Sequence, residues 1–121
     1  FLDTYVSELF DLAKKEGKDV KYIAANVLET EIEETDLLFI DTWHCYDQLL
    51  AELTIHAPKV KKYIAFHDTQ TYGTRSEEFM GRVGSNGLLP AIIHYLIENP
   101  NTWQFKIHRT NNNGLTVIER V

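Results

Sequence analysis

Two short apolar runs, each ending in titratable side chains, are the clearest feature of the hydrophobic pattern. Leu37 to Ile40 runs into Asp41, and Tyr63 to Phe66 runs into His67 and Asp68. Uninterrupted apolar runs of this length are typical of strands buried on both faces. A helical pattern lies between the two runs, which predicts a right-handed crossover between parallel strands. The titratable ends should therefore meet at one edge of the sheet, where open α/β sheets bind their ligands.

The remaining pattern predicts further elements on both sides of this crossover. Apolar residues at helical spacing, stopped by glycine or proline, indicate the helices, and β-prone runs indicate the strands. These elements are a helix from Asp3 to Glu16, a strand from Val20 to Val27, an acidic loop from Glu29 to Asp36, a helix from Tyr46 to Ala57, a loop from Thr69 to Gly87, a helix from Leu88 to Glu98 and a hairpin that turns at Asn113 and Gly114. We interpret the long loop as a lid, because structureless loops of this length are usually functional or disordered.

Composition narrows the class of protein. The 121 residues suffice for a single domain, 1–121, and 44% of them are hydrophobic. A net charge of −6 argues against binding to nucleic acid, and no apolar run approaches the length of a membrane span. The single cysteine, Cys45, excludes an internal disulfide and favours a reducing, cytoplasmic location. The chain begins at Phe1 without a methionine, which suggests a trimmed protein or a fragment.

The amino-acid sequence at the two strand ends resembles that of one enzyme family. The stretch Asp36-Leu-Leu-Phe-Ile-Asp-Thr-Trp-His-Cys-Tyr46, followed by Phe66-His-Asp68, is similar to class I S-adenosylmethionine-dependent methyltransferases, in their metal-assisted O-methyltransferase and cephalosporin-hydroxylase-like branch. The resemblance implies an α/β, Rossmann-like sheet that is mostly parallel, with a C-terminal antiparallel hairpin and without the family's N-terminal strands. It implies methyl transfer to a small hydroxylated acceptor and an adenine contact near Asn26.

The same resemblance shows what this stretch of chain lacks. The family's glycine-rich cofactor loop and its ribose-binding acid have no counterpart after Phe1. We therefore expect these residues alone to bind S-adenosylmethionine weakly or not at all. The missing strands should leave apolar sheet edges unpaired, which favours a homo-oligomer. Trp43 stands where some relatives carry an acid that is proposed as the general base, so the identity of the general base in this chain stays open.

Several residues are candidates for the chemistry. A divalent ion held by carboxylates lowers the pKa of a bound hydroxyl, and hard oxygen ligands suit magnesium. We predict a metal site of Asp41, Asp68 and His67, with His44 or His67 as the base. Trp43 could line an adenine or substrate pocket, or pack in the core. The aspartates could instead cap loops, and the histidines could be structural. Cys45 is expected to be a packed thiol, and His56, His94 and His108 to be surface or helix-face residues.

Two other classes remain open. A non-catalytic α/β module could keep the fold and serve in binding or assembly. A phosphate-binding receiver-like domain also has acid-tipped strands, but it should carry a lysine at a later strand end, and the sequence places none there.

Overall fold

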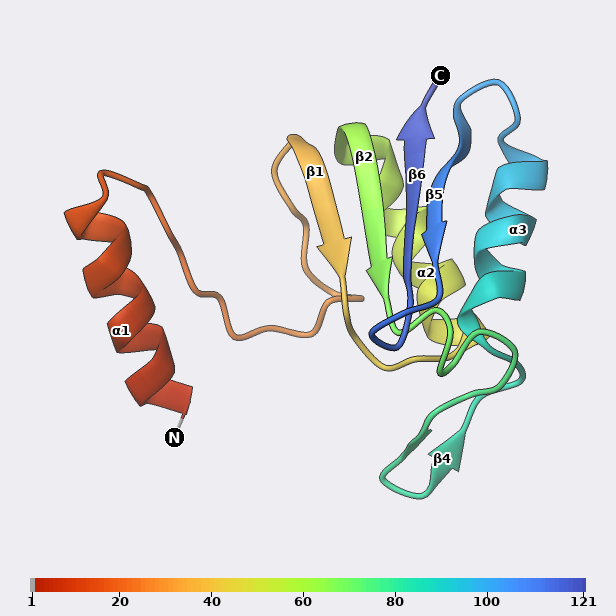
Figure 1. Cartoon of the computed structure of the whole chain (residues 1–121), viewed down its shortest axis with the longest axis horizontal. Coiled ribbons are helices and arrows are strands. Elements are labelled where there is room, and N and C mark those ends of the chain that lie inside the picture. Colours follow the sequence, from red (N-terminus) through yellow and green to blue (C-terminus); the bar gives the residue numbers. More distant parts are fainter. Residues whose placement is uncertain (1) are drawn as a thin grey trace.

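A four-stranded mixed sheet forms the centre of the molecule. The computed structural model describes residues 2–121, with side chains described from Val6 onward. The strands lie in the order β1 (Thr35–Ile40), β2 (Val60–His67), β6 (Leu115–Arg120) and β5 (Trp103–Arg109) (Figure 1). β1 and β2 are parallel, whereas β6 is antiparallel to both of its neighbours.

The α/β class and the parallel crossover are confirmed, but the expectation of a mostly parallel sheet is wrong. The C-terminal hairpin accounts for the difference. Because β6 enters beside β2 with the opposite direction and then pairs with β5, the hairpin contributes both antiparallel pairings, and only β1 and β2 pair in parallel.

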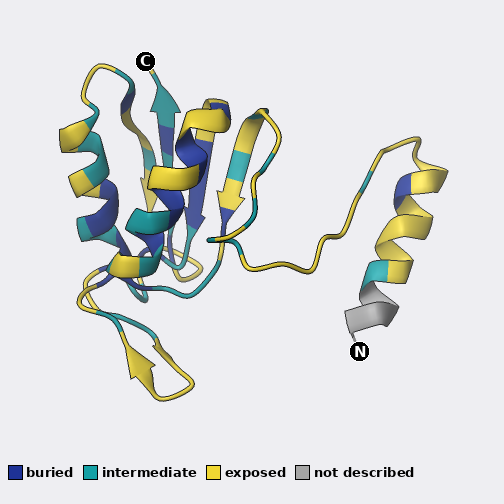
Figure 2. Cartoon of the chain, turned by 180° about the vertical axis from the view of Figure 1, so that it is seen from behind, coloured by how far each residue is buried: buried dark blue, intermediate teal, exposed yellow. Residues whose placement is uncertain are grey.

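Two helices cover one face of the sheet. α2 (Tyr46–His56) is the crossover between β1 and β2, is continued by the 3-10 turn η1 (Ala57–Lys59), and packs beside α3 (Leu88–Glu98). Figure 2 shows the buried side of these helices turned toward the strands. Their apolar residues close a core with the inner face of the sheet. The core comprises Ile40, Leu49, Leu53, Ala57, Val60, Ile64, Phe66, Leu88, Ala91, Ile92, Trp103 and Ile118.

The N-terminal segment does not add a strand to this sheet. α1 (Leu2–Lys15) ends one residue before the predicted Glu16, and Gly17 follows in the left-handed conformation, with φ of 69°. The predicted strand from Val20 to Val27 is wrong: the segment has no ladder, and Ile23 is 73% exposed. β-Propensity expresses how well a residue fits a half-buried pleated surface, and this segment has no such surface. In Figure 1, α1 stands apart from the sheet.

β1 consequently lies at the edge of the sheet with apolar side chains exposed. Leu37 is 54% exposed and Phe39 is 55% exposed. The expectation that this strand is buried on both faces is therefore wrong, because helices cover only one face of the sheet. An unpaired edge was expected, whereas the homo-oligomer inferred from it stays a prediction.

The connection from Thr69 to Gly87 is more ordered than a loop. It contains a small hairpin of β3 (Glu78–Phe79) and β4 (Arg82–Val83). Met80 and Gly81, with φ of 51° and 78°, form its two-residue turn, as primed hairpin turns require. The hairpin projects from the carboxyl edge of β1 and β2 (Figure 1).

Among the described residues, no helix combines the length and the apolar character needed to cross a membrane.

Candidate metal centre at the carboxyl edge of the parallel strands

The ends of β1 and β2 place three titratable residues side by side. Ile40 pairs with Phe66, so the next residue of each strand, Asp41 and His67, emerges at the same edge. Asp68 follows with φ of 61°, a left-handed conformation that aspartate tolerates better than most residues do. Its backbone N–H donates to the Gly114 carbonyl at 3.0 Å, which holds it in this conformation.

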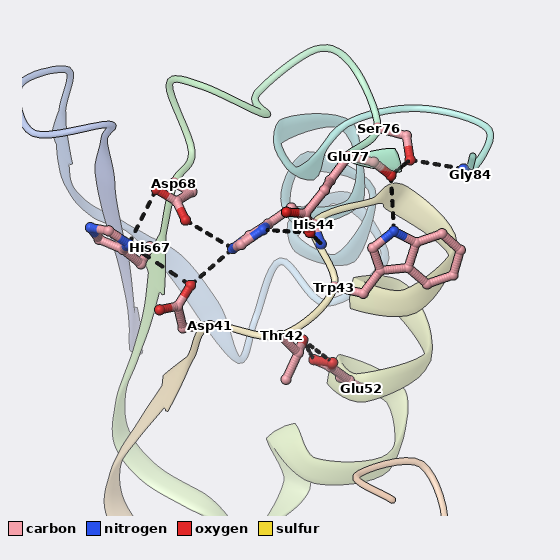
Figure 3. Close-up of polar contacts among 10 residues, drawn as sticks. All are labelled: Asp41, Thr42, Trp43, His44, Glu52, His67, Asp68, Ser76, Glu77 and Gly84. Atoms are coloured by element: carbon pink, nitrogen blue, oxygen red, sulfur yellow. Dashed lines mark hydrogen bonds and ion pairs between the residues drawn. The ribbon is translucent and has the colours of Figure 1, made fainter. Parts of the chain in front are cut away.

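His44 occupies the centre of the group. It lies in the loop between β1 and α2, and its side chain is only 12% exposed. Its Nε2 is 2.9 Å from Asp41 Oδ1 and 3.1 Å from Asp68 Oδ2, and its Nδ1 is 3.1 Å from Glu77 Oε1 (Figure 3). Its ring stacks on Tyr72, with centroids 5.1 Å apart.

The arrangement has too many acceptors for one imidazole. Nε2 carries at most one hydrogen but faces two carboxylates, while Nδ1 faces the carboxylate of Glu77. If Nδ1 donates to Glu77 in the neutral ring, the lone pair of Nε2 points at two negative groups. Either a proton on Nε2 or a bound cation is needed to make this contact favourable.

The distances fit a shared cation. One ligand atom each from Asp41, His44 and Asp68 lies within 4.8 Å of the others, so the three form a group that could hold a metal ion. Two ligands at about 2.1 Å from an octahedral ion, at right angles to each other, are about 3.0 Å apart. The contacts from Nε2 to the two carboxylates, 2.9 and 3.1 Å, match that spacing.

Glu77 orients His44 from the far side of the ring. The Glu77 backbone N–H donates to the His44 carbonyl at 2.8 Å, and its carboxylate accepts from the His44 backbone N–H at 3.3 Å. Trp43 Nε1 and Ser76 Oγ both donate to the Glu77 carbonyl, each at 2.9 Å. A carboxylate on the second ring nitrogen is the usual support of a histidine ligand, because it fixes the tautomer and the ring plane.

Thr42, the residue after Asp41, contacts another carboxylate, which has a different environment. Glu52 of α2 is 1% exposed and accepts hydrogen bonds from Thr42 Oγ1 and from Gln48 Nε2, the latter at 3.0 Å. Burial raises the pKa of Glu52, and its two donors partly offset the rise. Both carboxylate oxygens are engaged from within the protein, so this pair fixes the loop that carries Asp41.

The predicted site residues are only partly brought together. Asp41 and Asp68 lie in the cluster, and His67 borders it, with Nδ1 at 3.8 Å from Asp41 Oδ1 and 3.3 Å from Asp68 Oδ1. His44, predicted as a base, takes the central position among the potential ligands instead.

Neither residue predicted to contact cofactor belongs to the group that could hold a metal ion. Asn26 is exposed, and its side chain accepts from the Leu28 backbone N–H at 3.0 Å. The next residue, Val27, accepts at 2.7 Å from His56, which ends α2 about 15 Å along the helix from Tyr46. Trp43 packs instead against the hairpin, with the Arg82 guanidinium 5.2 Å from its ring centroid and the Phe79 ring 6.4 Å away. Their cofactor contacts stay predictions.

The other histidines and the cysteine differ in how far they are buried. His56 was expected at the surface or on a helix face; it ends α2, but it is not at the surface, since it is 2% exposed and its Nε2 contacts the Val27 carbonyl. His94 and His108 are exposed, as expected. Cys45 is a free, fully buried thiol, and burial raises its pKa, which argues against a nucleophile.

Sequence reasoning missed Glu77 altogether. It stands in the long connection, 33 residues from His44, and no periodicity marks it. The surrounding run of serine, glycine and arginine indicates only a loop.

Comparisons of the chain with protein-family models, with curated proteins and with solved structures gave no match in any of the three. The functional interpretation therefore depends on the geometry of the cluster itself.

Proposed function

We propose that the chain is the substrate-and-metal part of a metal-assisted, S-adenosylmethionine-dependent O-methyltransferase acting on a small hydroxylated acceptor. One observation carries this proposal: Asp41, His44 and Asp68 converge at the carboxyl edge of two parallel strands, and Glu77 orients the histidine. Ligand sites of open α/β sheets occur at this edge.

The strand arrangement supports a Rossmann-like assignment. The resemblance names two acid-tipped parallel strands, then a helix, then a C-terminal antiparallel hairpin. β1, β2, α3 and the β5–β6 hairpin follow in that order, with Asp41 and Asp68 directly after the parallel strands. We infer that the outer side of β1 is where further strands of such a sheet would pair.

In this proposal the ligand set suits a borderline divalent ion better than magnesium. Magnesium prefers six oxygens, whereas Asp41 and Asp68 would provide oxygen and His44 a ring nitrogen. Imidazole together with carboxylate suits manganese, iron or zinc. Manganese is the natural first probe, because it accepts both kinds of ligand.

In this proposal the ion and the residues around it would have different roles in the reaction. When bound, the ion would lower the pKa of the acceptor hydroxyl and so make its oxygen a better nucleophile toward the sulfonium methyl group. His67, which is 29% exposed and next to both aspartates, is placed to take up the hydroxyl proton. Glu77 and Tyr72 would keep the His44 ring fixed while the acceptor aligns.

The test is transfer of a labelled methyl group. Because these residues alone are expected to bind S-adenosylmethionine weakly at best, the labelled cofactor is supplied at high concentration, together with Mn²⁺ and a panel of phenols and sugars, and the label in the acceptor is measured. We expect transfer that needs Mn²⁺ and is lost in the double variant Asp41→Asn with Asp68→Asn.

Two other outcomes would contradict the proposal. Transfer of equal rate without a divalent ion, or in the double variant, would remove the metal from the mechanism. Mn²⁺ binding without any transfer, at a cofactor concentration where calorimetry shows S-adenosylmethionine bound, would favour the non-catalytic module.

A further inference from the structure

A hollow of about 320 Å³ opens beside His67. Its walls come from His67 and from the connection between β5 and β6. The residues of that connection are Arg109, Asn111, Asn112, Gly114 and Leu115. His67 also lies beside Asp41 and Asp68 (Figure 3), so the hollow adjoins the metal cluster on its His67 side.

Arg109 gives the hollow an uncompensated positive charge. Among the described residues, no carboxylate lies within 4.0 Å of its guanidinium, and its one side-chain hydrogen bond is a long one, 3.5 Å, to the His108 carbonyl. The chain as a whole has 18 acidic and 12 basic residues. The other arginines of the described chain contact a backbone carbonyl at 3.2 Å or less or an aromatic ring, whereas Arg109 has only the long contact to its neighbour, so its guanidinium is available to a ligand.

The connection is held rigidly against the strand end that carries Asp68. Asn112, Asn113 and Gly114 are all left-handed, with φ of 52°, 68° and 101°. The Asn113 carbonyl accepts from the Gln70 and Thr71 backbone N–H groups at 2.9 and 3.1 Å. A Cβ on Gly114 would lie 2.2 Å from the Gln70 nitrogen, so only glycine fits.

Asparagine tolerates the left-handed conformation better than most residues do, so Asn112 and Asn113 can hold this backbone beside Gly114. The sequence suggests only an Asn-Gly turn. In the structure, the same residues fix the distance between the wall of the hollow and Asp68.

We propose that this hollow binds an anionic group of the acceptor, a carboxylate or phosphate, and so positions the acceptor hydroxyl at the metal cluster. This inference rests on the proposed methyltransferase function. A guanidinium fork matches carboxylate and phosphate oxygens in bidentate fashion, and asparagine amides can add donors. The acceptor class is then a hydroxylated acid or a sugar phosphate.

The test is an NMR titration of the ¹⁵N-labelled chain with inorganic phosphate, glucose 6-phosphate, glucuronate and neutral glucose. We expect shifts confined to residues 109–115 and His67 with the three anions and none with glucose. Arg109→Gln should weaken anion binding about tenfold or more, since a hydrogen bond to a charged group is lost. The matched control is Arg75→Gln, because Arg75 is also exposed but bonds the Thr71 carbonyl outside the hollow.

A second arm tests whether the bound group belongs to an acceptor. With Mn²⁺ present, the proton signals of bound glucose 6-phosphate should broaden, and the broadening should disappear in Arg109→Gln. Binding of phosphate without broadening of the sugar would mean that only a free anion binds there, which overturns the acceptor role.

The remaining outcomes also decide the matter. Equal weakening by Arg109→Gln and Arg75→Gln, equal binding of glucose, or no response to any anion would overturn the subsite. If the chain binds Mn²⁺ but does not respond to any anion, the anion subsite is wrong and the proposed function is not affected. An anion response retained in a chain that binds no Mn²⁺ would instead count against the proposed function.

Discussion

The neighbouring residues Asp41 and Thr42 belong to two groups of carboxylates that differ in burial and in hydrogen bonding. Thr42 donates to Glu52, which is buried and accepts hydrogen bonds from two side chains. Asp41, which is 45% exposed, lies with Asp68 beside His44, and the two carboxylates contact the same nitrogen, Nε2. A carboxylate whose oxygens are all paired from within serves the fold. Carboxylates that converge on one ring nitrogen at an exposed edge form a group that could hold an ion.

The largest expected effect separates the two groups by stability. Glu52→Ala should lower the free energy of unfolding by about 3 kcal/mol, because it leaves the Thr42 hydroxyl and the Gln48 amide without an acceptor and opens a cavity. Asp41→Ala, in buffer with a chelator, should change it by less than about 1 kcal/mol, as for other exposed ion pairs. Urea unfolding measures both, and equal losses would erase the distinction between them.

The next effect concerns the orientation of His44. Glu77→Gln keeps the side-chain volume but removes the charge opposite Nδ1, so Mn²⁺ affinity should fall about 10- to 100-fold, as for other residues that support a histidine ligand. Calorimetry measures the affinity, and ¹⁵N NMR of the imidazole reports the tautomer. Glu78→Gln is the control, since Glu78 is exposed on β3. Identical affinities in the two variants would mean that Glu77 only anchors the hairpin.

The smallest effect is a pH dependence of Glu52. Burial raises its pKa, so between the unfolded and the folded pKa the native state holds a proton that the unfolded state has lost. Stability from this group therefore falls as pH rises through that window. Glu52→Gln should match the wild type at low pH and become relatively more stable as pH rises toward 7. Parallel unfolding curves at all pH values would show that Glu52 is not desolvated.

The sequence predicted the parts of the site that depend on local pattern. Asp41 and Asp68 follow uninterrupted apolar runs, and parallel pairing of those runs is enough to bring their ends together. His44 was visible because it stands three residues after Asp41 on the same loop. The hairpin turn at Asn113 and Gly114 was visible for the same local reason.

The parts that failed depend on tertiary partners. The run from Val20 to Val27 is β-prone, but a strand needs a neighbour to pair with, and the structure provides none for it. Glu77 acts through a contact 33 residues along the chain. His56 looks like a helix-face residue, and only the approach of the Val27 carbonyl shows why it is buried.

The central claim is that Asp41, His44 and Asp68 bind a divalent ion, and thermal unfolding with and without Mn²⁺ tests it most directly. An ion at 100 times its dissociation constant stabilises the native state by about 2.7 kcal/mol, which should raise the melting temperature of the wild type by several degrees. The double variant Asp41→Asn with Asp68→Asn should show no rise. An equal rise in both proteins, or none in the wild type, would contradict the metal centre and reduce the cluster to a histidine paired with acidic neighbours.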